Sequence, residues 1–130
     1  MVEINNLTGL IIDGNFLKAV AKKVLKERNK EKIDLSIVFV GQERMKKLNQ
    51  KYRRKNKLTD VLAFGEGLNE IVICPQEVKK NAKRFDSVFK KELARVLIHG
   101  ILHLLGYNHE KGGKEAEKME KKQNYYLSLI

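Results

Sequence analysis

SVFKKELARVLIHGILHLLGYNH, residues 87–109, contains the longest apolar stretch of this chain. Apolar side chains cover nearly the whole circumference of a helix over about 87–105, which predicts that the helix is buried in the protein core. Gly106 follows the periodic segment, where glycine supplies the left-handed turn that ends a helix. The stretch is too short and too often interrupted for the roughly 20 apolar residues of a membrane span, so we expect no membrane association.

Shorter periodic segments accompany this helix. Strands are predicted over residues 2–7, 34–40, 61–64 and 71–74, and further helices over about 15–28, 42–52, 75–84 and 113–128. Asp13 is placed to cap the first helix, and Pro75 to open the third. Gly65-Glu66-Gly67 indicates a turn between two paired strands. The pattern predicts an α+β fold with a single small mixed sheet of about four strands flanked by about five helices. No repeat or linker divides residues 1–130, which are interpreted as a single catalytic domain.

Composition and the amino-terminal residues point to an anionic partner and a cytoplasmic location. The 130 residues hold 27 Lys plus Arg against 16 Asp plus Glu, a net charge of +11. A small domain this basic favours RNA, DNA or an acidic surface. Cys74 is the single cysteine, so there is no intrachain disulfide partner and no cysteine zinc finger. Residues 1–6 carry neither a basic region nor an apolar signal core, which predicts a cytoplasmic protein.

All three histidines of the chain lie in the spacing H-x3-H-x2-G-x2-H, as His99, His103 and His109. The first two fall on one face of the helix, and a turn at Gly106 can return His109 to them. Imidazoles buried on an apolar helix need polar partners, and a metal ion satisfies them together. Three histidines leave the fourth tetrahedral position open for water, as in catalytic zinc sites. We therefore expect one zinc ion, although other divalent transition metals also accept imidazole.

The spacing also equals that of the metzincin peptidases, so the site is zincin-like and sits on a long helix. Gly100 stands where those enzymes carry the glutamate that acts as general base. Without that carboxylate, a peptidase would lose a proton-transfer contribution of about 10²–10⁴-fold. The sequence therefore argues against peptide cleavage.

A basic segment runs from Arg44 to Lys57 without an acidic residue. Its eight cations are Arg44, Lys46, Lys47, Lys51, Arg53, Arg54, Lys55 and Lys57. Charge this dense repels itself unless it faces an anion, and a guanidinium can clamp a phosphate through two hydrogen bonds. A metal with an open position and a phosphate-binding arginine suit phosphodiester cleavage. Met45, Leu48 and Tyr52 share one face of the helix in this segment, and the aromatic residues reveal no base-stacking platform.

Four motifs together resemble the YbeY family of bacterial ribosomal RNA maturation factors. They are the histidine segment and the runs LNQKYR, TDVLAF and NEIVIC at residues 48–53, 59–64 and 69–74. The resemblance spans about residues 34–127. It implies a single-strand-specific, metal-dependent endoribonuclease that matures the 3′ end of the small-subunit ribosomal RNA and acts in ribosome quality control. Ribosomal RNA and the small ribosomal subunit are then the partners.

The resemblance also implies roles for single residues. His99, His103 and His109 match the family's zinc ligands, and Arg53 matches its functionally important arginine, which we expect to hold the scissile phosphate. Lys51, Arg54, Lys55 and Lys57 are expected to add sequence-independent phosphate contacts. Asn108 replaces an aspartate that usually precedes the last histidine. Asparagine can hydrogen-bond a ligand or water, but it cannot accept a proton, so Asn108 is expected only to support the metal ligands.

Three points stay open from the sequence. No residue is identified as a general base, so either an activated water or the 2′-hydroxyl of the RNA could attack. A metallohydrolase acting on another substrate, such as a peptidase, is one alternative function. A non-catalytic ribosome-assembly factor, in which the metal ties the last loop to the long helix, is the other.

Overall fold

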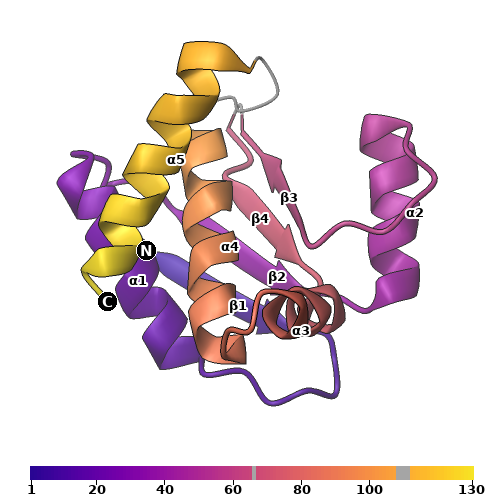
Figure 1. Ribbon diagram of the computed structural model, residues 1–130. Coiled ribbons are helices and arrows are strands. Elements are labelled where there is room, and N and C mark those ends of the chain that lie inside the picture. Colours follow the sequence, from indigo (N-terminus) through magenta and orange to yellow (C-terminus); the bar gives the residue numbers. More distant parts are fainter. Residues whose placement is uncertain (66, 108–111) are drawn as a thin grey trace.

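The computed structural model describes residues 1–65, 67–107 and 112–130, and these form four strands and five helices (Figure 1). In chain order they are β1 (Val2–Asn6), α1 (Gly14–Glu27), β2 (Leu35–Phe39), α2 (Gln42–Arg53), β3 (Val61–Phe64), β4 (Glu70–Ile73), α3 (Pro75–Arg84), α4 (Phe89–Leu104) and α5 (Gly113–Ser128). The predicted α+β class is confirmed, with every element within two residues of its expected bounds. In the described part of the chain, no helix is long and apolar enough to span a bilayer.

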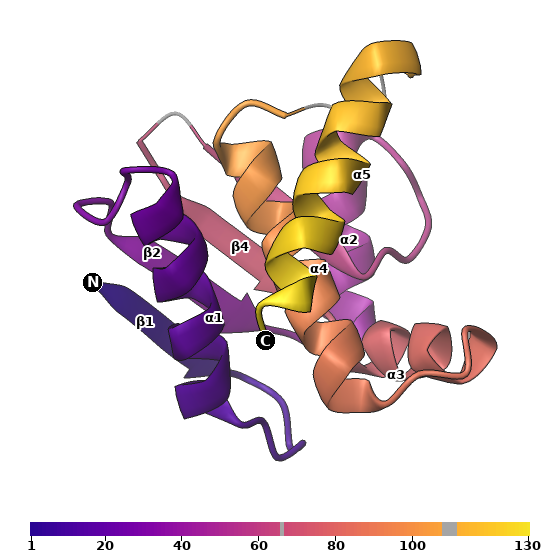
Figure 2. The ribbon, with the colours of Figure 1, turned by 60° about the vertical axis from the view of Figure 1, so that its left-hand side comes forward.

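The sheet is mixed, with the strand order β1-β2-β4-β3 (Figure 1). Figure 2 shows β1, β2 and β4 of this sheet from another side. β1 pairs in parallel with β2, and β2 pairs in parallel with β4. β3 and β4 form the predicted hairpin, in which Val61 lies opposite Ile73. This arrangement puts β3 at one edge of the sheet, where the segment between α2 and β3 meets it.

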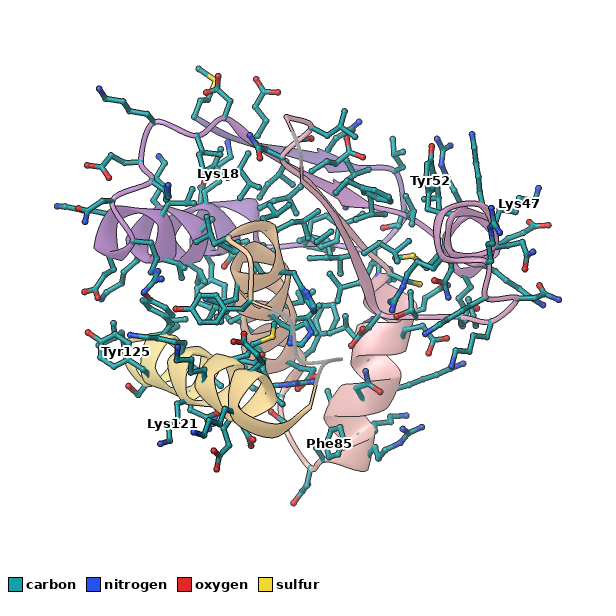
Figure 3. All side chains as sticks on the ribbon, turned by 90° about the horizontal axis from the view of Figure 1, so that it is seen from above. Lys18, Lys47, Tyr52, Phe85, Lys121 and Tyr125 are labelled. Carbon is teal, nitrogen blue, oxygen red and sulfur yellow. The ribbon has the colours of Figure 1, made fainter. Side chains whose placement is uncertain are left out.

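Helices cover both faces of the sheet, because its side chains alternate between two apolar clusters. Ile37 and Ile71 face the larger cluster, to which α1, α3, α4 and α5 contribute. Val72 faces the smaller cluster, which Met45 of α2 completes. Figure 3 looks along α2 and shows the strands lying between α2 and α4. Among the described residues, α2 is therefore the one helix on its face of the sheet, and α4 is central on the other face.

The ends of α4 have local causes. The helix begins two residues later than predicted, because Asp86 adopts a φ of 50° and Val88 is extended. At the other end, Gly106 has a φ of +100°, which confirms the predicted left-handed turn after the helix. Asp13 caps α1 as predicted, since its Oδ1 accepts a hydrogen bond of 3.1 Å from the Phe16 amide.

Gly100 lets α4 approach the sheet closely. A Cβ atom at this position would lie 3.1 Å from Ile71 Cγ2 and 3.3 Å from Val61 Cγ2. Both neighbours are β-branched side chains of the paired strands β3 and β4, which cannot easily give way. The residue that replaces the metzincin glutamate therefore fits because it has no side chain, and a carboxylate here would have to displace the sheet.

Replacing Gly100 with valine is expected to lower the free energy of unfolding by about 1–3 kcal/mol, the usual cost of overpacking a core. The measurement is urea denaturation followed by circular dichroism. Gly9→Val is the matched control, since nothing lies within 4 Å of a Cβ built there. Equal stability of the two variants would show that α4 can move away from the sheet.

Candidate active site

A cavity of about 660 Å³ lies where the end of α2, strand β3 and the second half of α4 meet. It is lined by Tyr52 and Arg53 of α2, by residues 59–64, by His99, Gly100 and His103 of α4, and by Gly106 and Tyr107. Three of the four motifs singled out in the sequence thus contribute side chains to one hollow. The fourth, around β4, supplies the strand that supports β3 and Gly100.

His99 and His103 lie side by side on the cavity wall. Their ring centroids are 4.8 Å apart, with the ring planes at 71°, as expected for histidines one helical turn apart. Both are half-buried rather than fully buried as predicted, because this side of α4 faces the cavity. Two imidazoles so placed are a donor set that suits zinc and similar divalent metals.

The remaining predicted residues of the metal centre, His109 and Asn108, lie outside the described residues. Within residues 1–65, 67–107 and 112–130, no group of three or more His, Cys, Asp or Glu side chains could hold a metal ion. The described part of the site therefore contributes two of the three predicted nitrogen ligands. The third ligand, His109, stays a prediction.

Gln123 of α5 orients one of the two histidines. Its Oε1 lies 2.8 Å from His99 Nδ1, and the Gln123 side chain is buried where α5 packs on α4. An amide oxygen is an acceptor only, so it favours the His99 tautomer with the proton on Nδ1. Nε2 is then the nitrogen for a metal, as in other sites where a second partner fixes the ligand ring. The role of Gln123 is not predicted from the sequence. The one signal for it is that this glutamine shares a helix face with the buried residues Met119 and Tyr126, where an apolar side chain is expected.

Gln123→Leu is expected to weaken metal binding by about 10–100-fold, the usual effect of removing a partner that orients a ligand. The measurement is competition with a chromogenic zinc chelator, using metal-depleted protein. Asn124→Leu is the matched control, because Asn124 is the next residue on α5 and is exposed. Identical zinc affinities for the two variants would contradict an orienting role for Gln123.

The structure separates the predicted basic residues into two groups. Arg53 lines the cavity at the end of α2. Lys51, Arg54, Lys55 and Lys57 are exposed and are not part of the cavity lining. All eight cations of the basic segment are solvent-exposed, and Arg53 is the one of them that lines the cavity.

Asn49 holds the end of this basic segment in place. It lies on the buried face of α2, and its side-chain Nδ2 donates a hydrogen bond of 2.9 Å to the Lys57 backbone carbonyl. The backbone carbonyl of Asn49 accepts hydrogen bonds from the backbone amides of Arg54 and Lys55. Arg54 adopts a left-handed conformation with a φ of 56°, which turns the chain back at the end of the helix. The orientation of Arg53 at the cavity is thus supported by a hydrogen-bonded turn.

Asp60 is the one carboxylate among the described residues of the cavity lining. Its Oδ2 accepts a hydrogen bond of 3.1 Å from Asn81 of α3, and its carbonyl accepts one of 2.9 Å from the Cys74 amide. Asp60 belongs to the TDVLAF motif of residues 59–64, but the sequence alone assigns it no role. A carboxylate fixed in this way can accept a proton or bind a cation.

Two charged side chains of α4, Glu92 and Arg95, form an ion pair near Asp60. Glu92 is 3% exposed, and its carboxylate accepts hydrogen bonds from the Arg95 guanidinium, including one of 2.9 Å from Nε. This bond, reinforced by the nearby Asp60 carboxylate, raises the pKa of Arg95. Arg95 is thus held by Glu92 and is not among the described residues that line the cavity, whereas Arg53 is.

Comparisons with known proteins agree on one family. The family model of endoribonuclease YbeY matches residues 3–130. An endoribonuclease YbeY of Thermodesulfovibrio yellowstonii is 46% identical over 105 residues, which cover 74% of this chain and 66%, just under two thirds, of that protein. One of Thermotoga neapolitana is 40% identical over 119 residues, covering 88% of this chain and 80% of the relative.

A solved structure shares the fold. The solution structure of a Thermotoga maritima protein superposes with a TM-score of 0.70 at 34% sequence identity, and it covers 98% of this chain and 87% of that one. The family match extends over nearly the whole sequence, and it includes every motif that lines the cavity or supports it. The chain therefore belongs to the endoribonuclease YbeY family, whose members are metal-dependent hydrolases of phosphodiester bonds.

Proposed function

We propose that this chain is a zinc-dependent endoribonuclease, specific for single-stranded RNA, that matures the 3′ end of the small-subunit ribosomal RNA and serves ribosome quality control. In this proposal residues 1–130 act as one catalytic domain in the cytoplasm, with ribosomal RNA and the small ribosomal subunit as partners. The observation that supports it most strongly is that Arg53 of α2 and the two imidazoles of α4 line one cavity.

His99, His103 and His109 hold the zinc ion, and Asn108 supports the last of these ligands. When bound, the metal supplies Lewis-acid activation of the phosphate or of the attacking group. Gln123 keeps His99 in the ligating tautomer through the hydrogen bond to Nδ1. The role of the protein at this position is to offer nitrogen donors, of which His99 is oriented by Gln123.

Arg53 is the catalytic cation of the proposal. It binds the scissile phosphate and neutralises the negative charge that develops on the phosphoryl oxygens during cleavage. A guanidinium suits this role because it stays charged and donates two parallel hydrogen bonds. The Asn49 side chain supports it indirectly, since it fixes the turn that follows α2.

The exposed cations near Arg53 bind the RNA backbone on either side of the cut. Lys51, Arg54, Lys55 and Lys57 are exposed and lie within four residues of Arg53 in the chain. Contacts of this kind ignore base sequence and release counterions, so RNA affinity falls steeply as salt rises. The net charge of +11 adds long-range attraction for RNA.

The test uses a 5′-labelled RNA that carries the 3′-terminal sequence of the small-subunit ribosomal RNA. We expect internal cuts in the single strand and at least tenfold slower cleavage when a complementary strand covers it. Equal cleavage of both forms, or stepwise shortening from one end, would contradict the proposal. The product ends identify the nucleophile, since a 2′,3′-cyclic phosphate excludes direct attack by water.

A further inference from the structure

Tyr52 is an unusual aromatic residue because it is exposed at the wall of the catalytic cavity. It lies one residue before Arg53 on α2 and is 54% exposed. Figure 3 shows it on the side of α2 that faces the sheet, whereas Lys47 projects from the outer side. Tyr52 therefore lies on the inner face of α2, which is the face directed at the sheet.

The exposure of Tyr52 does not follow from its position on α2. Met45 and Asn49 lie seven and three residues earlier on the same face, and both are almost completely buried. At Tyr52 this face extends beyond the apolar cluster between α2 and the sheet and borders the cavity instead. The protein thus leaves a large aromatic surface uncovered at its active site.

We infer that the Tyr52 ring stacks on a nucleobase next to the scissile phosphate and thereby makes the enzyme specific for unpaired RNA. The inference rests on the proposed function, because it assigns a specificity residue to that site. The ring and the Arg53 guanidinium come from adjacent residues and line the same cavity. One nucleotide can therefore present its base to Tyr52 and its phosphate to Arg53.

The surroundings of the ring suit this role. Phe64 of β3 supports Tyr52 in an edge-to-face contact, with centroids 5.0 Å apart and planes at 71°. The Lys51 ammonium lies 5.2 Å from the Tyr52 ring centroid. This lysine is exposed, so it can move to a phosphate when a base takes its place. Phe64 at the sheet edge thus supports the ring, and the charged side chain beside the ring is itself exposed.

Stacking explains how a sequence-independent site can reject a duplex. Every base offers a flat face, so a single aromatic side chain accepts any of the four. In a duplex these faces are covered by neighbouring base pairs, and side chains reach only the groove edges and the backbone. A phosphate-binding surface alone would bind both forms, whereas contact with Tyr52 requires an unpaired base.

The first experiment measures binding without catalysis. Single-stranded RNAs carrying 2-aminopurine at successive positions are titrated with metal-depleted protein, and fluorescence quenching reports stacking. At one position, wild type and Tyr52→Phe are expected to quench strongly, and Tyr52→Ala to lose the quenching and bind about tenfold more weakly. Tyr125→Ala is the matched control, because Tyr125 is 46% exposed on α5 and lies far from Tyr52 (Figure 3).

The second experiment is a mutant cycle on both partners, read out as KM and kcat with metal-loaded protein. Removing the base at the quenched position, by an abasic substitution, is expected to raise KM about tenfold for the wild type and to leave KM of Tyr52→Ala unchanged. Tyr52→Ala is also expected to reduce the preference for single strands over duplexes by about the same factor. Thermal unfolding of each variant checks that the fold is kept.

Each outcome decides between the inference and its alternatives. Full quenching and an unchanged strand preference in Tyr52→Ala would overturn the inference while the nuclease function stands. Loss in Tyr52→Phe equal to that in Tyr52→Ala would also overturn it, because the hydroxyl and not the ring would then be responsible. If wild type neither binds nor cuts single-stranded RNA, the proposed function itself fails.

Discussion

His103→Ala is expected to reduce RNA cleavage by at least about 10²-fold, which is the order of effect of losing one preorganised electrostatic contributor in an active site. His103 lies on the cavity wall with its ring 4.8 Å from that of His99. Removing it leaves at most two of the three proposed nitrogen ligands, so zinc content should fall together with activity. The measurements are the initial rate on a labelled single strand and the zinc content by mass spectrometry.

The control for this variant is Leu104→Ala. Leu104 is the next residue on α4 and half-buried, but it is not part of the cavity lining and carries no metal donor. It should lose some stability and keep its zinc. If His103→Ala retains wild-type cleavage while its zinc content falls, cleavage does not need the metal, and a metal-dependent nuclease site at His103 is contradicted.

Arg53→Gln is expected to lower kcat by about 10²–10³-fold, because Arg53 is proposed to stabilise charge that appears only in the transition state. KM should change much less than kcat, since the exposed cations around Arg53 supply most of the ground-state attraction. The variant leaves the basic surface nearly intact, with seven of the eight cations of residues 44–57 in place. Steady-state kinetics on a short single-stranded RNA separate the two parameters.

Arg54→Gln is the matched comparison for Arg53→Gln. Both residues are exposed arginines at the end of α2, but only Arg53 lines the cavity. Arg54→Gln should raise KM and reduce the salt dependence of binding by about one phosphate contact, with kcat nearly unchanged. Equal kinetic effects of the two substitutions would mean that Arg53 is one backbone contact among several.

Local signals in the sequence predicted most of the fold. Asp13, Pro75 and Gly106 mark helix ends through capping, a fixed φ and a left-handed turn, each of which acts within a few residues. The β3–β4 hairpin was likewise predicted from its glycine-containing turn. The parallel pairing of β2 with β4 was not predicted, because it joins segments far apart in the chain and depends on how helices cover the sheet.

Some features of the candidate site could likewise be predicted from local sequence patterns, whereas others depend on packing between distant segments. The pairing of His99 with His103 follows from helical spacing alone, and so it could be predicted. The bond from Gln123 to His99 depends on the packing of α5 against α4, which no local pattern encodes. The sequence predicts that Tyr52 shares one face of the helix with Met45 and Leu48, but only the packing in the folded protein reveals that its ring is left exposed.

The central claim is tested most directly by metal removal and restoration on the wild-type protein. Purified protein is dialysed against a chelator, assayed on a labelled single-stranded RNA, and assayed again after one equivalent of zinc is added. The account predicts that internal cleavage disappears on chelation and returns with zinc, at unchanged cut positions. Cleavage that persists in the metal-free protein at the same positions and rate would contradict a metal-dependent nuclease built on His99 and His103.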